Sequence, residues 1–473
     1  RRRIAADGAG GGSTALTSKG HDGGMQIDRR GFIAGSVASA AALATPAIAA
    51  QGLDAAQFGV RPGAPDDQSV RMQRAIDRAA RTRAPLWLAP GVYRVGDLKL
   101  AAGSQLIGVR GATTLTLTQG ASLVSADHGD TITLSGLTLD GTGAALARGR
   151  GLIDLADIRA LRIEDCAIVR AGGNGLMLTQ CDGDIIRNSI IDAAETALFS
   201  TDARGLNIVG NTVRGSGNNG IAVWQSDKRH DGSLVADNTV EDTKARAGGS
   251  GQNGNAISMF RAGDVIVRGN HIRNAAFSAV RGNSAANIQI LGNSCRDCDD
   301  VALYSEFDFE GCVMADNVVD GAGNGLSVTN FDFQHGRLAT VHGNVLRNLK
   351  PRAAGAAPED FGRGMLVQGD TTVTGNVIEG AAAVGIRAGW GPYLRNVAIT
   401  GNVLRQCAVG VEVSVVKGTE QALIADNIFD QVPGGAVVGM EWVKPVTGDL
   451  TKDGAAAYPQ LTIANNRVRQ NAR

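Results

Sequence analysis

A short motif centred on asparagine recurs along most of this chain, and in each copy an aliphatic or aromatic residue follows two or three positions later. With Asp165 as a variant first member, the motif occurs at Asn188, Asn211, Asn238, Asn270, Asn293, Asn317, Asn344, Asn376, Asn402, Asn427 and Asn466. The intervals run 23, 23, 27 and 32 residues and then 23, 24, 27 and 32, so four units form a super-unit that is itself repeated. Periods of this length are typical of stacked repeat proteins.

Each unit also contains a run of alternating residues, as in 175–178 and 220–224. Alternation predicts a strand with one buried face. Because strands this short cannot bury a face alone, we expect them to coil and stack as parallel rungs, which gives an all-β parallel β-helix. Its asparagines are then expected to form a ladder of side-chain amides in one turn. The 65 glycines suit the turns, and the aromatic content of 4% suits a narrow interior.

The longer units place their extra residues in matched segments of the two super-units. Residues 225–234 correspond to 330–338, and residues 242–254 correspond to 348–363. We expect two long loops per super-unit, projecting from the same side of the coil.

The segment that begins at Met25 has the order of an export signal: Arg29-Arg30, an apolar stretch, and Ala47-Ile48-Ala49 as a cleavage site. It resembles a twin-arginine (Tat) signal, which implies transport by the Tat translocase and a periplasmic or secreted location. We therefore expect an unstructured extension at 1–24, a signal peptide at 25–49 and a β-helix domain at 50–473. The apolar stretch is too short for a membrane span, so we expect no membrane anchor in the mature form.

The 46 basic and 46 acidic residues balance, and removal of the first 49 residues leaves a slight acidic excess. Nucleic acid is therefore not expected as a partner. The six cysteines show neither a second C-x-x-C pair for zinc nor a βαβ pattern for a redox motif. We expect buried, inert thiols.

The segment before the repeats has the features of a cap. A helix is expected around Met72, Ala75, Ile76 and Ala79, which form one apolar stripe, with Asp67 or Ser69 as its cap. Together with Phe58-Gly59-Val60, Asp66-Asp67 and 86–93, this helix resembles the N-terminal cap of the pectate-lyase-like superfamily. The resemblance implies a right-handed, single-stranded, pectin-lyase-like β-helix with an N-terminal capping helix. The whole chain resembles an uncharacterised family of Tat-translocated repeat proteins, which leaves the function open.

Alternation also predicts which side chains point outward. The expected inward column is Leu176, Leu198, Ile221, Ile257, Val280, Leu303, Leu326, Ile386 and Val411. One outward column is then Met177, Phe199, Ala222, Ser258, Arg281, Tyr304, Ser327, Arg387 and Glu412, and a second is Thr179, Thr201, Trp224, Phe260, Asn283, Glu306, Thr329 and Gln368. Aromatic rings beside Arg and Glu are typical of sugar-binding surfaces. The alternative is that Phe199, Trp224, Phe260 and Tyr304 form a satellite core under the long loops.

Both super-units contain Asp-x-x-His after the alternating run, as Asp227 with His230 and Asp332 with His335. Histidine titrates near neutral pH and a nearby carboxylate can orient it, so the pair suits general acid or base catalysis. Duplication alone also explains the motif.

A glycoside hydrolase needs clustered carboxylates on neighbouring rungs. Asp299-Asp300 resembles the paired aspartates of polygalacturonases, but Asn324 stands where that family has histidine, so this activity is disfavoured. The run Tyr304, Glu306, Asp308 and Glu310 is interpreted as a cation site, a sugar site or a solvated acidic turn. Calcium lacks further support, and we assign no metal or cofactor.

These patterns favour a lyase or epimerase acting on an acidic polysaccharide. The expected catalytic residues are His230, Asp227, Arg281 and Tyr304. The expected substrate-binding residues are Trp224, Phe260, Asn283, Glu306, Asp308, His335 and Arg387. In this hypothesis arginine neutralises a uronate carboxylate, and histidine or tyrosine exchanges the adjacent proton. The alternative is a non-catalytic, glycan-binding or structural β-helix protein of the cell envelope.

Overall fold

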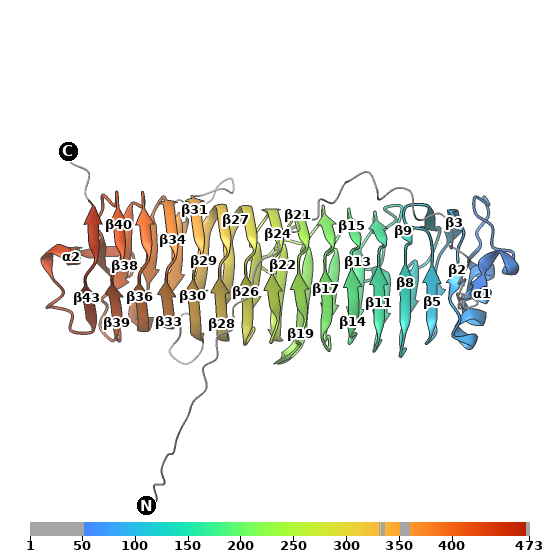
Figure 1. Ribbon diagram of the computed structural model, residues 1–473, viewed down its shortest axis with the longest axis horizontal. Coiled ribbons are helices and arrows are strands. Elements are labelled where there is room, and N and C mark those ends of the chain that lie inside the picture. Colours follow the sequence, from blue (N-terminus) through green and yellow to red (C-terminus); the bar gives the residue numbers. More distant parts are fainter. Residues whose placement is uncertain (1–51, 331, 333–335, 351–359, 470–473) are drawn as a thin grey trace, which may run out of the picture. The chain divides into compact units, whose positions relative to one another are not determined.

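The computed structural model describes residues 52–330, 332, 336–350 and 360–469. The expected extension at 1–24 and signal peptide at 25–49 lie outside these residues. In the described part, the chain winds into a coil whose strands stack side by side along one axis (Figure 1). The strands form three faces, here called A, B and C. Pairing between turns of the coil is parallel, and one hairpin, β41 with β42 (Lys444–Asp449), is antiparallel.

Face A is a sixteen-stranded sheet. It contains β1 (Leu53–Asp54), β2 (Leu86–Trp87), β5 (Ser104–Ile107), β8 (Ile132–Ser135), β11 (Leu161–Glu164), β14 (Gly183–Ile186), β17 (Leu206–Val209), β20 (Leu234–Ala236), β23 (Ile266–Arg268), β26 (Ile288–Leu291), β28 (Glu310–Ala315), β30 (Arg337–His342), β33 (Gly369–Thr374), β36 (Arg395–Thr400), β39 (Ala422–Ala425) and β43 (Leu461–Ala464).

Face B follows face A in each turn of the coil. It contains β3 (Gly91–Val95), β6 (Thr113–Leu117), β9 (Thr138–Asp140), β12 (Ala167–Val169), β15 (Ser189–Ile191), β18 (Thr212–Arg214), β21 (Thr239–Thr243), β24 (His271–Ala275), the first halves of β27 (Ser294–Glu306) and β29 (Val318–Thr329), β31 (Val345–Leu349), β34 (Val377–Ala381), β37 (Val403–Arg405), β40 (Ile428–Asp430) and β44 (Arg467–Arg469).

Face C completes the turn. It contains β4 (Leu98–Lys99), β7 (Val124–Ala126), β10 (Gly151–Ala156), β13 (Asn174–Thr179), β16 (Leu198–Thr201), β19 (Ile221–His230), β22 (Ile257–Gly263), β25 (Val280–Asn283), the second halves of β27 and β29, β32 (Arg363–Val367), β35 (Val384–Ala388), β38 (Val409–Ser414) and β41 (Val437–Glu441).

The inward column predicted from alternation is confirmed. Leu176, Leu198 and Ile221 are Cα partners on successive strands of face C, and the column continues in register to Val411. All its members are fully buried. Burying a side chain of this size stabilises the folded state by roughly 1.5–3 kcal/mol, so stacking these positions fixes the register of the coil. The two outward columns stack in the predicted order, but they are not uniformly exposed. Seven of their members are buried: Ala222, Ser258, Arg281, Glu306, Ser327, Thr329 and Gln368.

The asparagine ladder is also confirmed. It occupies the turn between faces A and B, where each Asn Oδ1 accepts hydrogen bonds from the backbone N and the Nδ2 of the Asn one turn before it. For Asn293 and Asn317 these distances are 2.9 and 3.0 Å. Each Nδ2 also donates to a backbone carbonyl, such as Ile290 O at 2.9 Å from Asn317. The ladder runs from Asn188 to Asn466 and satisfies polar groups that would otherwise be buried without partners.

The assignment of Asp165 as the first member of the ladder is wrong. Asp165 has φ of 54° and lies one position before the ladder, at the left-handed position that Arg187 and Gly210 occupy in the next turns. The ladder position belongs to Cys166, whose backbone N donates to Asn188 Oδ1 at 2.9 Å. The spacing in the sequence placed the first ladder member one residue too early, because Asp165 resembles an asparagine of the ladder.

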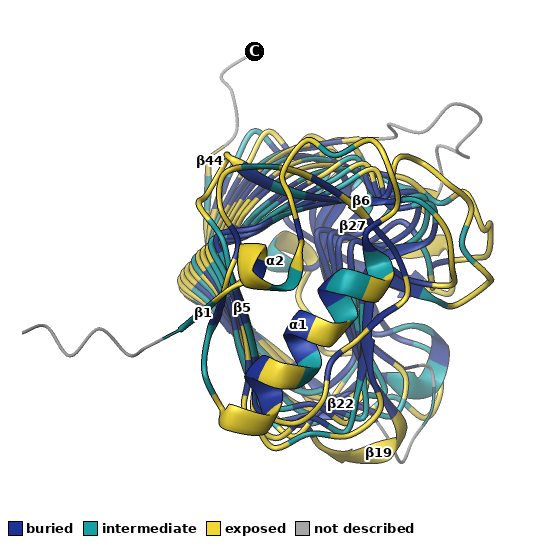
Figure 2. Cartoon of the chain, turned by 90° about the vertical axis from the view of Figure 1, so that its right-hand side faces the viewer, coloured by how far each residue is buried: buried dark blue, intermediate teal, exposed yellow. Residues whose placement is uncertain are grey.

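Helix α1 (Ser69–Thr82) lies across the N-terminal end of the coil (Figure 2). It buries Met72, Ala75, Ile76 and Ala79 as predicted, and it covers the first rungs, whose edge would otherwise attract another strand. The N-cap position is Gln68, whose side chain makes no capping hydrogen bond, so the expected cap at Asp67 or Ser69 is wrong. Asp67 lies one residue earlier and its Oδ1 accepts from Ser69 N at 2.8 Å. At the other end, α2 (Leu450–Asp453) contacts β43 and both strands of the β41–β42 hairpin.

The first matched segment is strand rather than loop. Residues 225–230 extend β19, and after a break in register His230 pairs with Gly263 of β22. Part of the corresponding segment 330–338 lies outside the described residues, and residues 351–359 of the second matched pair lie outside them entirely. Residues 244–256 precede β22 of face C, and most of the corresponding segment of the second super-unit lies outside the described residues.

All six cysteines are buried and free, as expected. Burial raises the pKa of Cys166 to about 12 and that of Cys181 to about 11, so these thiols stay protonated and unreactive at neutral pH. No helix in the described ranges is long and apolar enough to cross a membrane.

Candidate functional site

Three aromatic rings form a ladder on the outside of face C. Phe199, Trp224 and Phe260 come from β16, β19 and β22, and their ring centroids are 4.9 and 5.5 Å apart. All three side chains are partly exposed, and none belongs to the buried core. Their exposure favours a binding surface over a satellite core, because sugar rings stack on accessible flat faces.

The next two turns of the coil carry a polar cluster. Arg281 and Asn283 are on β25, directly beside Tyr304 and Glu306 of β27. The Nε of Arg281 donates to Glu306 Oε1 at 2.6 Å, Nη2 bonds the same oxygen, and Asn283 Nδ2 donates to it at 3.0 Å. The Arg281 guanidinium lies 5.4 Å from the centre of the Tyr304 ring. The structure therefore brings together four of the residues predicted from the sequence.

The surroundings raise the pKa of two groups in this cluster. Burial, followed by the Glu306 carboxylate, raises the pKa of Tyr304, so its hydroxyl keeps its proton and can act as a donor. Burial also raises the pKa of Asp300, which precedes this part of β27, although the Val301 backbone N and the charge of Arg281 oppose the shift. A carboxylate with a raised pKa is a stronger base when ionised.

The edge of the Arg281 guanidinium group that carries Nη1 faces the segment that precedes β22. Its Nη1 is buried and makes no hydrogen bond to any described residue. Gly251 lies against this atom: a Cβ on Gly251 would be 1.4 Å from Nη1. An anion that reaches this edge must displace the segment around Gly251.

His230 and Asp227 do not join this cluster. His230 Nδ1 lies 2.7 Å from Asp264 Oδ2, and this hydrogen bond lowers the pKa of Asp264. The imidazole is exposed and lines a hollow of about 400 Å³ with Asp202 and Arg204, on earlier turns than Arg281. Asp227 is exposed in the same extension of β19. His335 lies outside the described residues.

The acidic run after Tyr304 does not converge on one point. Glu306 faces Arg281, whereas the Asp308 carboxylate lies 3.2 Å from Lys228 Nζ. Glu310 pairs with Arg337. Among the described residues, no group of three or more His, Cys, Asp or Glu side chains is placed to hold a metal ion.

Arg387 lies farther along the same outward column, in a pocket of about 300 Å³ that also contains Arg363 and Trp390. Its Nε donates to Glu412 Oε2 at 2.6 Å. Arg363 and Trp390 were missed from the sequence. Trp390 is one of only four tryptophans, which was the available signal.

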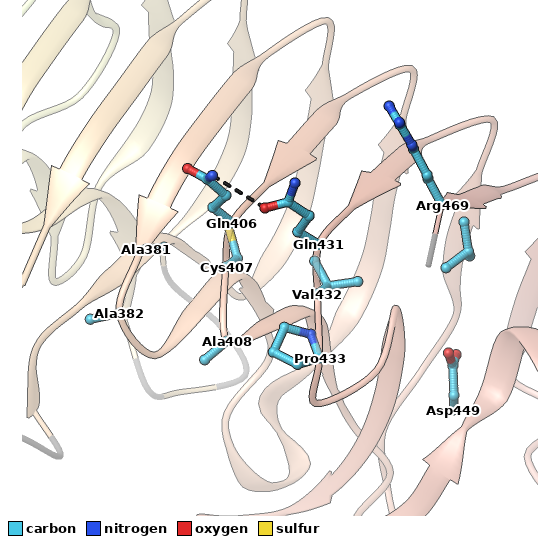
Figure 3. Close-up of a pocket in the computed structure, with 11 residues that line it drawn as sticks. Ala381, Ala382, Gln406, Cys407, Ala408, Gln431, Val432, Pro433, Asp449 and Arg469 are labelled. Carbon is cyan, nitrogen blue, oxygen red and sulfur yellow. Dashed lines mark hydrogen bonds between the residues drawn. The ribbon is translucent and has the colours of Figure 1, made fainter. Parts of the chain in front are cut away.

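A larger hollow of about 680 Å³ lies near the C-terminal end, between turns that join faces B and C (Figure 3). Gln406 Nε2 donates to Gln431 Oε1 at 3.2 Å on one side of it. Asp449 also lines it, but its oxygens accept from the backbone N of Ala436 and Val437. Because these backbone hydrogen bonds already use the Asp449 carboxylate, the hollow presents fewer groups for binding or catalysis than face C.

The family model described as a right-handed β-helix region matches residues 131–244 and 229–393, more than half of the chain. The chain belongs to the right-handed β-helix family. No curated protein matches it.

Solved structures share the fold at low identity. Gene product 12 of bacteriophage phi29, in its pre-mature form, is 16% identical with a TM-score of 0.50 over 82% of this chain, which spans 54% of that protein's length. The N-terminal fragment of the same product gives a TM-score of 0.51 at 16% identity, over 82% of this chain and 69% of the fragment. The catalytic unit of an α-1,3-glucanase from Streptomyces thermodiastaticus gives 0.48 at 14% identity, over 89% and 69%.

Proposed function

We propose that this β-helix binds an acidic polysaccharide along face C and acts on it as a lyase or epimerase. The observation that carries the proposal is the order of side chains on one face: the aromatic ladder, the Arg281 cluster and the Arg387 pocket follow one another along the coil axis. Aromatic rings stack on sugars and guanidinium groups pair with carboxylates, so this order suits an extended chain of acidic sugars.

The cluster has groups for proton transfer. In the lyase reaction, ionised Asp300 takes the proton from the carbon beside the sugar carboxylate, and a carbon–carbon double bond forms as the bond to the neighbouring sugar oxygen breaks. Tyr304 donates its proton to that leaving oxygen. Arg281 Nη1 stabilises the developing negative charge once the segment around Gly251 has moved. In the epimerase reaction, Tyr304 instead returns a proton to the opposite face of the same carbon.

Tyr304→Phe tests this role. We expect turnover to fall by about 10²–10⁴-fold, because the proton donor is lost while the ring and its contact with Arg281 remain. Turnover is measured by the ultraviolet absorbance of unsaturated products, or by NMR for inversion of a sugar centre, on pectate and alginate. Tyr458→Phe, outside face C, is the control. Equal turnover in Tyr304→Phe and the native chain would contradict the mechanism.

A second candidate is a non-catalytic glycan-binding protein of the envelope. The observation that favours it is the mutual pairing of Arg281 and Glu306, whose side chains are only 10% and 4% exposed. If this candidate is correct, the native chain migrates more slowly in gels that contain acidic polysaccharide, but it releases no unsaturated product and inverts no sugar centre.

Export through the Tat pathway to the periplasm or beyond belongs to the same proposal, since the substrates are extracellular polymers. Its support is the sequence Arg29-Arg30 ahead of an apolar stretch and Ala47-Ile48-Ala49. Replacement of both arginines by lysine is expected to hold the chain in the cytoplasm, as measured by cell fractionation. Unchanged export of this variant would overturn the Tat assignment.

A further inference from the structure

Arg281 and Arg387 occupy equivalent positions on face C. The outward column passes from Arg281 through Tyr304, Ser327 and Leu366 to Arg387, each the Cα partner of the one before it. Four turns of the coil separate the two arginines, which corresponds to about 19 Å along the axis at about 4.8 Å per turn. The interval equals one super-unit, so the duplication that produced the long segments also placed an arginine in both copies.

The surroundings of the two arginines also correspond. Each uses Nε and Nη2 to bind one carboxylate from the following turn, Glu306 in the first case and Glu412 in the second. Each has an aromatic ring within reach: Tyr304 at 5.4 Å and Trp390 at 5.8 Å from the guanidinium carbon. In both pairs the carboxylate binds the edge of the guanidinium group that carries Nε and Nη2, which leaves Nη1 for another partner.

The two arginine side chains are about equally buried, at 10% and 13% exposed, but the second one lines a pocket. The pocket beside it is lined by Arg363, Leu366, Gln368 and Trp390, and its volume is about 300 Å³. Nη1 of Arg387 makes no hydrogen bond to any residue in the described ranges. The pocket thus combines a guanidinium edge, an aromatic ring and apolar walls, which together match a sugar ring that carries an anionic group.

Two arginines line the pocket, and each affects the other. Burial, and then the charge of Arg387, lowers the pKa of Arg363, which shows that two cations share a poorly solvated space. Glu412 is bound to Arg387, and Asp360 at the rim is exposed. A carboxylate or sulfate group on the ligand can pair with the Nη1 edge of Arg387, which the bonds to Glu412 leave available.

We propose that the pocket of Arg363, Arg387 and Trp390 is a second subsite for an acidic sugar, so that one polysaccharide chain contacts both super-units at once. This inference rests on the proposed function and specifies how long its ligand must be. Thr329, which lines this pocket, is the Cα partner of Glu306, so the two subsites are neighbours along one surface. Once the first subsite is filled, binding at the second is intramolecular, and affinity rises without any new contact type.

The test measures affinity against ligand length. Oligogalacturonates and oligomannuronates of increasing length are titrated into the full chain by isothermal calorimetry. We expect weak binding of short oligomers and a rise of roughly 100-fold or more once an oligomer spans both subsites. Trp390→Ala, and separately the charge-neutral pair Arg387→Gln with Glu412→Gln, are expected to remove this rise while leaving short oligomers bound as before. Circular dichroism checks that both variants fold.

Arg405→Gln is the matched control, because Arg405 pairs with Glu379 at 2.8 Å on face B, away from the pocket. It is expected to keep the rise with length. If the native chain binds short and long oligomers equally, or if both pocket variants keep the rise, the second subsite is overturned while the proposed function stands. If no oligomer of any length binds, the proposed function itself is overturned.

Discussion

Asn317→Ala is expected to lower the free energy of unfolding by about 3–5 kcal/mol, because it removes one rung from the middle of the asparagine ladder. Asn317 is fully buried. Its Oδ1 accepts from Asn293 N and Nδ2, and its Nδ2 donates to Ile290 O and Asn344 Oδ1. The alanine variant leaves Asn293 N and Ile290 O unsatisfied in the interior, and each such group costs about 1–3 kcal/mol.

The free energy is measured by chemical denaturation followed by circular dichroism. Asn207→Ala is the control: Asn207 is exposed on face A and donates one hydrogen bond, to Asp184 Oδ1 at 3.0 Å. Its effect is expected to stay within about 0.5 kcal/mol. A loss in Asn317→Ala no larger than in this control would show that the ladder does not stabilise the coil.

Arg281→Ala is expected to destabilise the chain by about 3–5 kcal/mol, because it leaves the Glu306 carboxylate buried without its cation. The side chain of Glu306 is 4% exposed, and the Asn283 amide and the Tyr304 hydroxyl would remain as its hydrogen-bond partners without restoring the lost positive charge. Replacing both members, with Arg281→Met and Glu306→Leu, is expected to recover most of the loss, since an apolar pair of similar volume needs no desolvation of charge.

Denaturation of Arg281→Met, Glu306→Leu and the variant that carries both substitutions forms a double-mutant cycle. The pair of Arg214 with Glu241 gives the comparison: Arg214 is 54% exposed, and Glu241 also pairs with Arg273, so Arg214→Ala is expected to cost about 0–1 kcal/mol. If Arg281→Ala behaves like Arg214→Ala, the cluster is solvated, and the raised pKa of Tyr304 loses its physical cause.

Most of the fold could be predicted from the sequence because two periodic signals agree. Alternation marks inward positions such as Leu198 and Ile221, and the asparagine spacing marks where one turn ends. In a coil, both signals fix spatial neighbours directly, since each turn stacks on the one before it. The order of the outward columns was therefore predictable residue by residue, whereas the ion pair between Arg281 and Glu306 was not foreseen.

Features that depend on the path of irregular segments could not be predicted. His230 pairs with Asp264 because β19 continues past Trp224 with a break in register, which alternation does not reveal. The contact between Gly251 and Arg281 depends on how segment 244–256 folds back. Trp390 is the N-cap residue of a short helix, Gly391–Tyr393, so it lies outside the alternating pattern of the strands.

The central claim is that an acidic polysaccharide lies along face C, parallel to the coil axis. A crystal structure of the protein with a bound oligogalacturonate or oligomannuronate tests it most directly. We predict sugar rings stacked on Trp224 and Phe260 and a carboxylate at Nη1 of Arg387. Density for the sugar on face A or face B, or across the coil axis, would contradict the account.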